Sequence, residues 1–211
     1  MKADIFGLYA ITAETDNSEQ LLLEVDAALR GGAGAIQYRD KSADIARQHE
    51  QASELKLLCA KYHVPLIIND SLRLAALVDA DGVHLGMHDG AIEEARIILG
   101  PEKIIGISCY ADADRALTAQ KRGADYAAFG CFFSSQTKPH ATRAPLAVLD
   151  EAAARLQINI VAIGGITLDN APLVIERGAD AIAVLGGLFH HPHITERARQ
   201  FCDLFKVESE E

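Results

Sequence analysis

A glutamine and two cations alternate along one short stretch of the chain, QYRDK. Residues two apart lie on the same face of a β-strand, so Gln37, Arg39 and Lys41 would project together if the strand continued. Two cations beside an amide donor are suited to binding a phosphate or pyrophosphate. The same residues fit a solvated strand end whose cations pair with Asp40 or Asp44, and at this stage both interpretations stay open.

Two aspartates follow neighbouring apolar segments. Asp70 comes directly after Asn69 and the run PLII, and Asp89 comes at the end of the next unit. Carboxylates beside a cationic phosphate site can bridge Mg²⁺ to pyrophosphate oxygens, so we expect a magnesium site here. In the alternative interpretation, Asp70 caps a helix beginning at Ser71 and Asp89 caps one beginning at Gly90.

The histidines near these carboxylates could indicate zinc, but we expect magnesium. His84 lies within a predicted strand, where we expect it to pack or to form a hydrogen bond. Zinc needs a tighter ligand set than His84, His88 and Asp89 offer, so magnesium is preferred.

The elements that position these residues are short apolar runs that alternate with longer stretches of helical period. The predicted strands are Phe6–Thr12, Ala35–Arg39, Leu66–Asn69, Gly82–Leu85, Ile104–Ser108, Tyr126–Gly130, Ile160–Gly164 and Ala181–Leu185. The predicted helices span 18–30, 43–62, 71–78, 90–99, 112–122, 145–156, 169–177 and 194–205. Continuous apolar strands separated by helices predict an α/β protein with a covered parallel sheet.

Eight such units favour a closed (β/α)8 barrel, the TIM barrel, over an open sheet, although periodicity does not establish closure. Arg30-Gly31-Gly32, Arg122-Gly123 and Arg177-Gly178 repeat one helix-to-strand joint, with a cation in the last turn and a glycine after it. Because no linker-like stretch divides it, we expect residues 1–211 to form a single domain, with a frayed acidic tail at 206–211.

Composition excludes several classes of function. The net charge of -10 and the absence of tryptophan disfavour nucleic-acid binding. An apolar run of about 18 residues, as a membrane span needs, does not occur in the sequence. The 4 cysteines are scattered without a CxxC pair, and the start MKADIFGLYAIT does not read as a signal peptide, so we expect a reduced cytoplasmic protein.

A second anion site is predicted after the later strands, where such barrels often bind phosphate. A hydroxyl-rich loop there contains Ser134, Ser135, Gln136, Thr137 and Lys138. Glycine pairs follow the last two strands, at Gly164-Gly165 and Gly186-Gly187. Their N–H groups could approach an anion closely. A plain surface loop and simple turn geometry are the alternatives.

In their order and spacing, seven segments resemble the thiamine phosphate synthase family over almost the whole chain. The segments are QYRDK at 37–41, IND at 68–70, ADGVHLG at 80–86 with Asp89, IGIS at 105–108, ADYAAFG at 124–130, TK at 137–138 and AIGGI at 162–166. The resemblance implies condensation of an aminopyrimidine pyrophosphate with a thiazole phosphate, simple or carboxylated, to thiamine phosphate and pyrophosphate. It also implies a dissociative reaction assisted by Mg²⁺, in which the thiazole nitrogen captures a pyrimidine cation.

The resemblance also implies a role for each matching residue. The residues expected to bind the pyrimidine substrate are Gln37, Arg39, Lys41, Asn69, Ser108 and Lys138. Those expected to bind the thiazole phosphate are Ser135, Gln136, Thr137, Gly165, Leu185 and Gly186. Mg²⁺ would be held by Asp70 and Asp89. The residues expected to act in catalysis are Arg39, Lys41, Ser108 and Lys138.

The chain departs from the family pattern at Met87, Tyr110, Ser135 and Gly186, chiefly on the thiazole side. The related thiazole tautomerase is an alternative, but it would not need the complete pyrophosphate and metal set. A non-catalytic regulator that binds thiamine precursors is another. The sequence predicts small phosphorylated partners, allows a homo-oligomer, and does not identify the natural thiazole acceptor.

Overall fold

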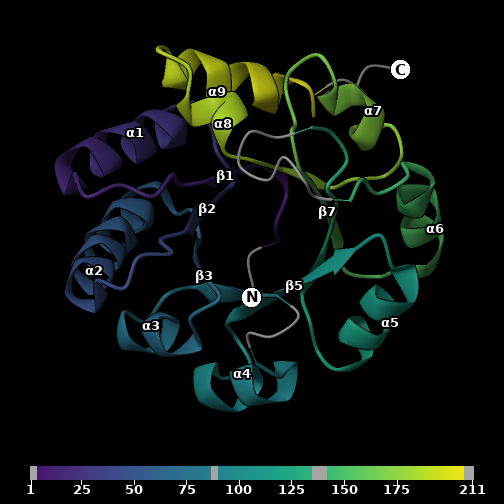
Figure 1. Ribbon diagram of the computed structural model, residues 1–211, viewed down its shortest axis with the longest axis horizontal. Coiled ribbons are helices and arrows are strands. Elements are labelled where there is room, and N and C mark those ends of the chain that lie inside the picture. Colours follow the sequence, from purple (N-terminus) through teal and green to yellow (C-terminus); the bar gives the residue numbers. More distant parts are fainter. Residues whose placement is uncertain (1–3, 87–89, 135–141, 207–211) are drawn as a thin grey trace.

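The barrel is closed. A computed structural model describes residues 4–86, 90–134 and 142–206, and within them eight parallel strands pair in chain order. The last strand pairs with the first, Gly7 opposite Ala181. Figure 1 shows the helices around these strands in the order of the sequence, from purple α1 to yellow α9. The predicted (β/α)8 barrel is therefore confirmed.

The strands begin and end within two residues of their predicted bounds. They are β1 (Gly7–Ile11), β2 (Ala35–Tyr38), β3 (Leu66–Asn69), β4 (Gly82–Leu85), β5 (Ile104–Tyr110), β6 (Tyr126–Phe129), β7 (Asn159–Ile163) and β8 (Ala181–Val184). The largest difference is β5, which continues past Ser108 to Tyr110 because its pairing with β6 shifts register between these two residues.

The predicted helices are present, and each is equal to or slightly shorter than expected. They are α1 (Ser18–Arg30), α2 (Ile45–Tyr62), α3 (Leu72–Leu77), α4 (Ile92–Leu99), α5 (Ala113–Lys121), α6 (Ala147–Arg155), α7 (Ala171–Ile175) and α9 (Ile194–Asp203). One further helix, α8 (Gly186–Phe189), was not predicted, because a glycine pair is a poor helix former. Across the described ranges, none of the helices is both long and apolar enough to cross a membrane.

Strand side chains alternate between two apolar layers. Leu8 and Ala10 face outwards into the layer between strands and helices, whereas Tyr9 and Ile11 belong to a smaller cluster inside the barrel. This alternation follows from the two-residue period of a strand. Polar side chains can therefore enter the barrel interior only at inward positions.

Three aspartates stabilise the end of the barrel at which the strands begin. Each precedes an even-numbered strand and accepts a hydrogen bond from a main-chain N–H of the strand before it. The bonds are Leu66 N to Asp81 (2.9 Å), Ile105 N to Asp125 (2.8 Å) and Ile160 N to Asp180 (2.7 Å). These carboxylates satisfy N–H groups at the strand starts, a face of such barrels that serves stability rather than chemistry.

The repeated helix-to-strand joint has one conformation at all three places. Gly32, Gly123 and Gly178 have φ of 99°, 96° and 89°, in the left-handed region that glycine enters without strain. The prediction of a glycine cap is confirmed, although Gly32 rather than Gly31 takes this conformation in the first joint. The predicted tail lies outside the described residues beyond Lys206.

Candidate functional site

The two predicted cations lie in the loop after β2 rather than on the strand. Arg39 N donates to Thr12 Oγ1 (3.0 Å) and Lys41 N donates to Glu14 Oε2 (2.9 Å). The segment after β1 thus holds the main chain of this loop at the carboxyl end of the strands. Strand β2 ends at Tyr38, so the prediction that Arg39 lies on this strand was wrong, and the strand does not continue to Lys41. Both residues do lie at this end of the barrel.

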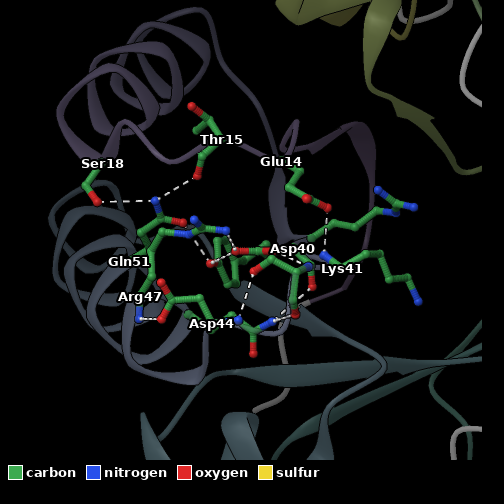
Figure 2. Close-up of polar contacts among 12 residues, drawn as sticks. Glu14, Thr15, Ser18, Asp40, Lys41, Asp44, Arg47 and Gln51 are labelled. Carbon is green, nitrogen blue, oxygen red and sulfur yellow. Dashed lines mark hydrogen bonds and ion pairs between the residues drawn. The ribbon is translucent and has the colours of Figure 1, made fainter.

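The side chain of Asp40 holds this loop against helix α2. Its side chain is only 1% exposed, and it accepts from Ser42 N (2.7 Å) and Arg47 Nη2 (3.3 Å). Burial raises the pKa of this carboxyl, but the hydrogen bonds from Ser42 and Arg47 outweigh it and lower the pKa below its usual value. Figure 2 shows Asp40 turned towards Arg47 while Lys41 extends to the other side.

The alternative in which Asp40 or Asp44 pairs with the two cations does not hold for Lys41. Asp40 pairs with Arg47 of α2, and Asp44 caps α2 by accepting from Arg47 N (3.0 Å). Lys41 instead forms an ion pair with Asp70. The Lys41 ammonium therefore remains on the side of the loop where β3 ends.

Asp70 does not cap the helix that follows it. Ser71 is the N-cap of α3 and accepts from Leu74 N (3.1 Å). Asp70 takes a left-handed conformation (φ 63°), and its N–H donates to His84 O (2.8 Å). The carboxylate is therefore turned to Lys41 at the barrel mouth, next to the half-buried Asn69 of β3.

The second predicted metal ligand, Asp89, lies outside the described residues, as does His88. The N-cap of α4 is Ala91, so this helix begins at Ile92 and not at Gly90, and the alternative in which Asp89 caps it does not hold. In the described ranges, no group of three His, Cys, Asp or Glu side chains is arranged to hold a metal. Asp70 is thus the one predicted magnesium ligand whose position the structure describes, and a carboxylate oxygen is a ligand that Mg²⁺ prefers.

Gln37 and Ser108 lie deeper than the cations, inside the barrel. Gln37 is 4% exposed and donates from Nε2 to the Tyr9 hydroxyl (2.8 Å). Ser108 Oγ lies 2.9 Å from His84 Nε2, and the Ser108 carbonyl accepts from Arg115 Nε (2.9 Å). The expectation that His84 packs or hydrogen-bonds within its strand is confirmed.

Tyr9 and Tyr126, both fully buried, were missed from the sequence. Their hydroxyls are 2.8 Å apart, and Tyr126 also contacts His84 Nδ1 at 2.9 Å. Burial is the largest influence on both phenols and raises their pKa values, so both stay protonated. One signal was available in the sequence. Each tyrosine occupies an inward-facing position of an otherwise apolar strand, where a buried hydroxyl needs a hydrogen-bond partner.

The neutral half of the predicted site is only partly described. Ser135, Gln136, Thr137 and Lys138 lie outside the described residues. A Cβ on Gly165 would come within 2.3 Å of the Ser134 carbonyl oxygen, so this glycine lets the segments that follow β6 and β7 pack closely. Leu185 is the N-cap of α8, and Gly186 is its first residue. Gly165 thus serves backbone packing, and this use is compatible with anion binding.

The family follows from comparison with known proteins. A family model described as thiamine monophosphate synthase matches residues 8–188. The chain belongs to this family. A thiamine-phosphate synthase of Thiobacillus denitrificans is 55% identical, over 97% of both chains. One of Methylobacillus flagellatus is 52% identical, over 95% of this chain and 96% of the other.

Solved structures agree with the family. A thiamine phosphate pyrophosphorylase from Pyrococcus furiosus superposes with a TM-score of 0.85 at 34% identity, over 97% of both chains. An orotidine 5'-phosphate decarboxylase from Pyrococcus horikoshii has a TM-score of 0.70 at 14% identity, over 95% of this chain and all of the other, and shows the fold alone. Family membership makes the chain an enzyme of thiamine biosynthesis, a transferase.

Proposed function

We propose that the chain condenses an aminopyrimidine pyrophosphate with a thiazole phosphate to give thiamine phosphate and pyrophosphate. The observation that carries this proposal is the ion pair of Lys41 with Asp70 at the barrel mouth, beside the main chain of Arg39 and above the interior Gln37 and Ser108. Chemistry in (β/α)8 barrels takes place at this end of the strands. The family relatives support the same reaction.

Charge at the mouth suits the pyrophosphate. Arg39 and Lys41 would bind its oxygens and stabilise the negative charge that develops as the bond to the pyrimidine methylene breaks. Lys41 would exchange its present partner, Asp70, for the pyrophosphate. Lys138, outside the described residues, is proposed to add a third cation.

Asp70 and Asp89 are proposed to hold Mg²⁺. Asp70 fits this role because Ser71 caps α3 in its place, which leaves the carboxylate at the mouth. A bound Mg²⁺ would supply Lewis-acid stabilisation of the pyrophosphate leaving group.

The remaining residues would orient the two rings and exclude water. Gln37 and Ser108 would contact the pyrimidine, with Asn69 beside them. The thiazole phosphate would be held by the residues after β6 to β8, namely Ser135, Gln136, Thr137, Gly165, Leu185 and Gly186. The thiazole nitrogen would then capture the pyrimidine cation without a protein nucleophile, so positioning carries much of the rate.

The decisive assay measures both products together. Purified protein with the pyrimidine pyrophosphate, the thiazole phosphate and Mg²⁺ should release thiamine phosphate and pyrophosphate in equal amounts. Chelation by EDTA and the substitution Asp70→Ala should each abolish product, while Asp203→Ala, on the outer helix α9, should not. If the folded protein binds precursors but forms no product, the synthase proposal is wrong, and a tautomerase or a precursor-binding regulator replaces it. A cytoplasmic setting stays a prediction.

A further inference from the structure

A continuous chain of hydrogen bonds crosses the barrel interior. It runs from Gln37 of β2 to Tyr9 of β1 (2.8 Å), on to Tyr126 of β6 (2.8 Å), then His84 of β4 (2.9 Å) and Ser108 of β5 (2.9 Å). Both its ends are expected to contact the pyrimidine, and the three residues between them have no assigned role. We call these five residues the interior relay.

The rings of the interior relay are held tightly. The Tyr9 and Tyr126 rings meet edge to face, 5.9 Å apart at 85°, and the His84 ring stacks on Tyr126 at 5.5 Å and 20°. Gly106 of β5 makes room for this arrangement, because a Cβ there would lie 1.9 Å from the Tyr126 ring. A tightly packed ring keeps its hydroxyl in one place, so Tyr126 can set the geometry of its neighbours.

The contact between Gln37 and Tyr9 favours one direction of hydrogen-bond donation along the relay. Gln37 Nε2 donates to the Tyr9 oxygen, so the single Tyr9 proton is available for Tyr126. If Tyr126 in turn donates to His84 Nδ1, a neutral His84 ring has its proton on Nε2 and directs it to Ser108 Oγ. In this arrangement Gln37 offers its carboxamide oxygen as an acceptor, and Ser108 directs its own proton away from His84.

We propose that Tyr126 is a positioning residue that fixes the interior relay in this direction, so that the site presents one acceptor at Gln37 and one donor at Ser108. This inference rests on the proposed function. An aminopyrimidine carries an N–H donor on its amino group and acceptors at its ring nitrogens, so it matches this pair. A 4-oxo pyrimidine replaces the amino donor with an acceptor and a ring acceptor with an N–H, so it mismatches. The relay therefore selects the amino ring.

The test compares the amino substrate with its 4-oxo analogue, both as pyrophosphates. Tyr126→Phe keeps the ring but breaks the relay, and it should raise the KM for the amino substrate and reduce the kcat/KM ratio of amino to oxo about 10-fold. The KM for the thiazole phosphate should change less than about 2-fold, because the relay does not reach β7 or β8.

Two further variants keep the inference falsifiable. Tyr9→Phe breaks the same relay one step earlier and should reduce the ratio in the same way, which guards against a folding defect peculiar to Tyr126→Phe. Tyr62→Phe removes a phenol that donates to Asp26 on the outside of the barrel (2.6 Å), and it should leave the ratio unchanged. Circular dichroism and thermal unfolding establish that each variant is folded.

The outcomes separate the two proposals. If the unaltered protein turns over and folded Tyr126→Phe and Tyr9→Phe keep its amino-to-oxo ratio, the relay inference is wrong while the proposed function stands. An equal loss with both pyrimidines and with the thiazole phosphate would also overturn it, since a general structural role predicts that pattern. If the unaltered protein forms no thiamine phosphate, the proposed function fails, and the inference fails with it.

Discussion

Removing the Asp40 carboxylate should cost stability far more than removing a surface acid. In Asp40→Ala, the 2.7 Å bond from Ser42 N is lost outright, whereas the contacts from Arg47 and Tyr38 are long, at 3.3 Å each. A hydrogen bond to a charged group contributes about 1.5–3 kcal/mol. Stranding the partner of a buried pair adds to this, but less than the full 3–5 kcal/mol, because the Arg47 side chain is 22% exposed.

We therefore expect Asp40→Ala to lower the free energy of unfolding by about 2–4 kcal/mol, and the melting temperature by about 5–15 °C for a domain of this size. Urea titrations followed by circular dichroism measure the first quantity, and thermal scans the second. The matched control is Asp203→Ala, which removes an exposed pair with Lys206 and should change the free energy by less than about 0.5 kcal/mol.

The difference between the unaltered protein and Asp40→Ala should also depend on pH. The folded-state pKa of Asp40 is lowered, so its contribution is fully present above the unfolded pKa and is lost as pH falls through the folded value. The two unfolding curves should thus be separated by a constant amount above about pH 5 and converge in stronger acid. Equal losses in Asp40→Ala and Asp203→Ala, or a gap that widens in acid, would refute this reasoning.

Two further outcomes concern residues that have no proposed part in the reaction. Asp180→Ala should lower the free energy of unfolding by about 1–3 kcal/mol, because Ile160 N loses its acceptor at 2.7 Å. The kcat should stay unchanged at temperatures where the variant is folded, and a large drop in kcat there would contradict a purely structural role for Asp180. Burial raises the pKa of the Cys59 and Cys109 thiols to about 12, so iodoacetamide at pH 8 should label them only after unfolding, as read by mass spectrometry; rapid labelling of the folded protein would contradict it.

The fold was predictable because local pattern and global architecture agree. Apolar runs such as Leu66–Asn69 and Gly82–Leu85 have the same bounds in the sequence prediction and in the structure. Helix α8 was not predictable from propensity, since Gly186 and Gly187 disfavour a helix in isolation. One carbonyl at its start accepts two hydrogen bonds from the helix: Leu185 O accepts from Leu188 N (3.1 Å) and Phe189 N (2.9 Å).

The site residues were predictable where a charged residue comes directly after a strand. They were not predictable where a side chain is positioned by partners on the other side of the barrel. Lys41 and Asp70 could be grouped because consecutive parallel strands end at one edge. The alternation of β6 could have placed the Tyr126 ring inside the barrel, but its partners Tyr9 and His84 could not be foreseen, because they come from strands far away in the sequence. The choice between Asp70 and Ser71 as the cap of α3 likewise depends on backbone angles that no residue pattern reveals.

The pairing of β1 with β8 has a consequence for how the barrel is made. Each of the other seven strand pairings joins neighbours in the chain, but this seam joins residues near its two ends, such as Tyr9 and Ala183. Contacts of such long separation bear the largest loop-closure entropy and form late. During synthesis, β1 cannot pair with β8 until β8 has left the ribosome. Nascent chains therefore expose an unpaired strand edge that is absent from the closed barrel.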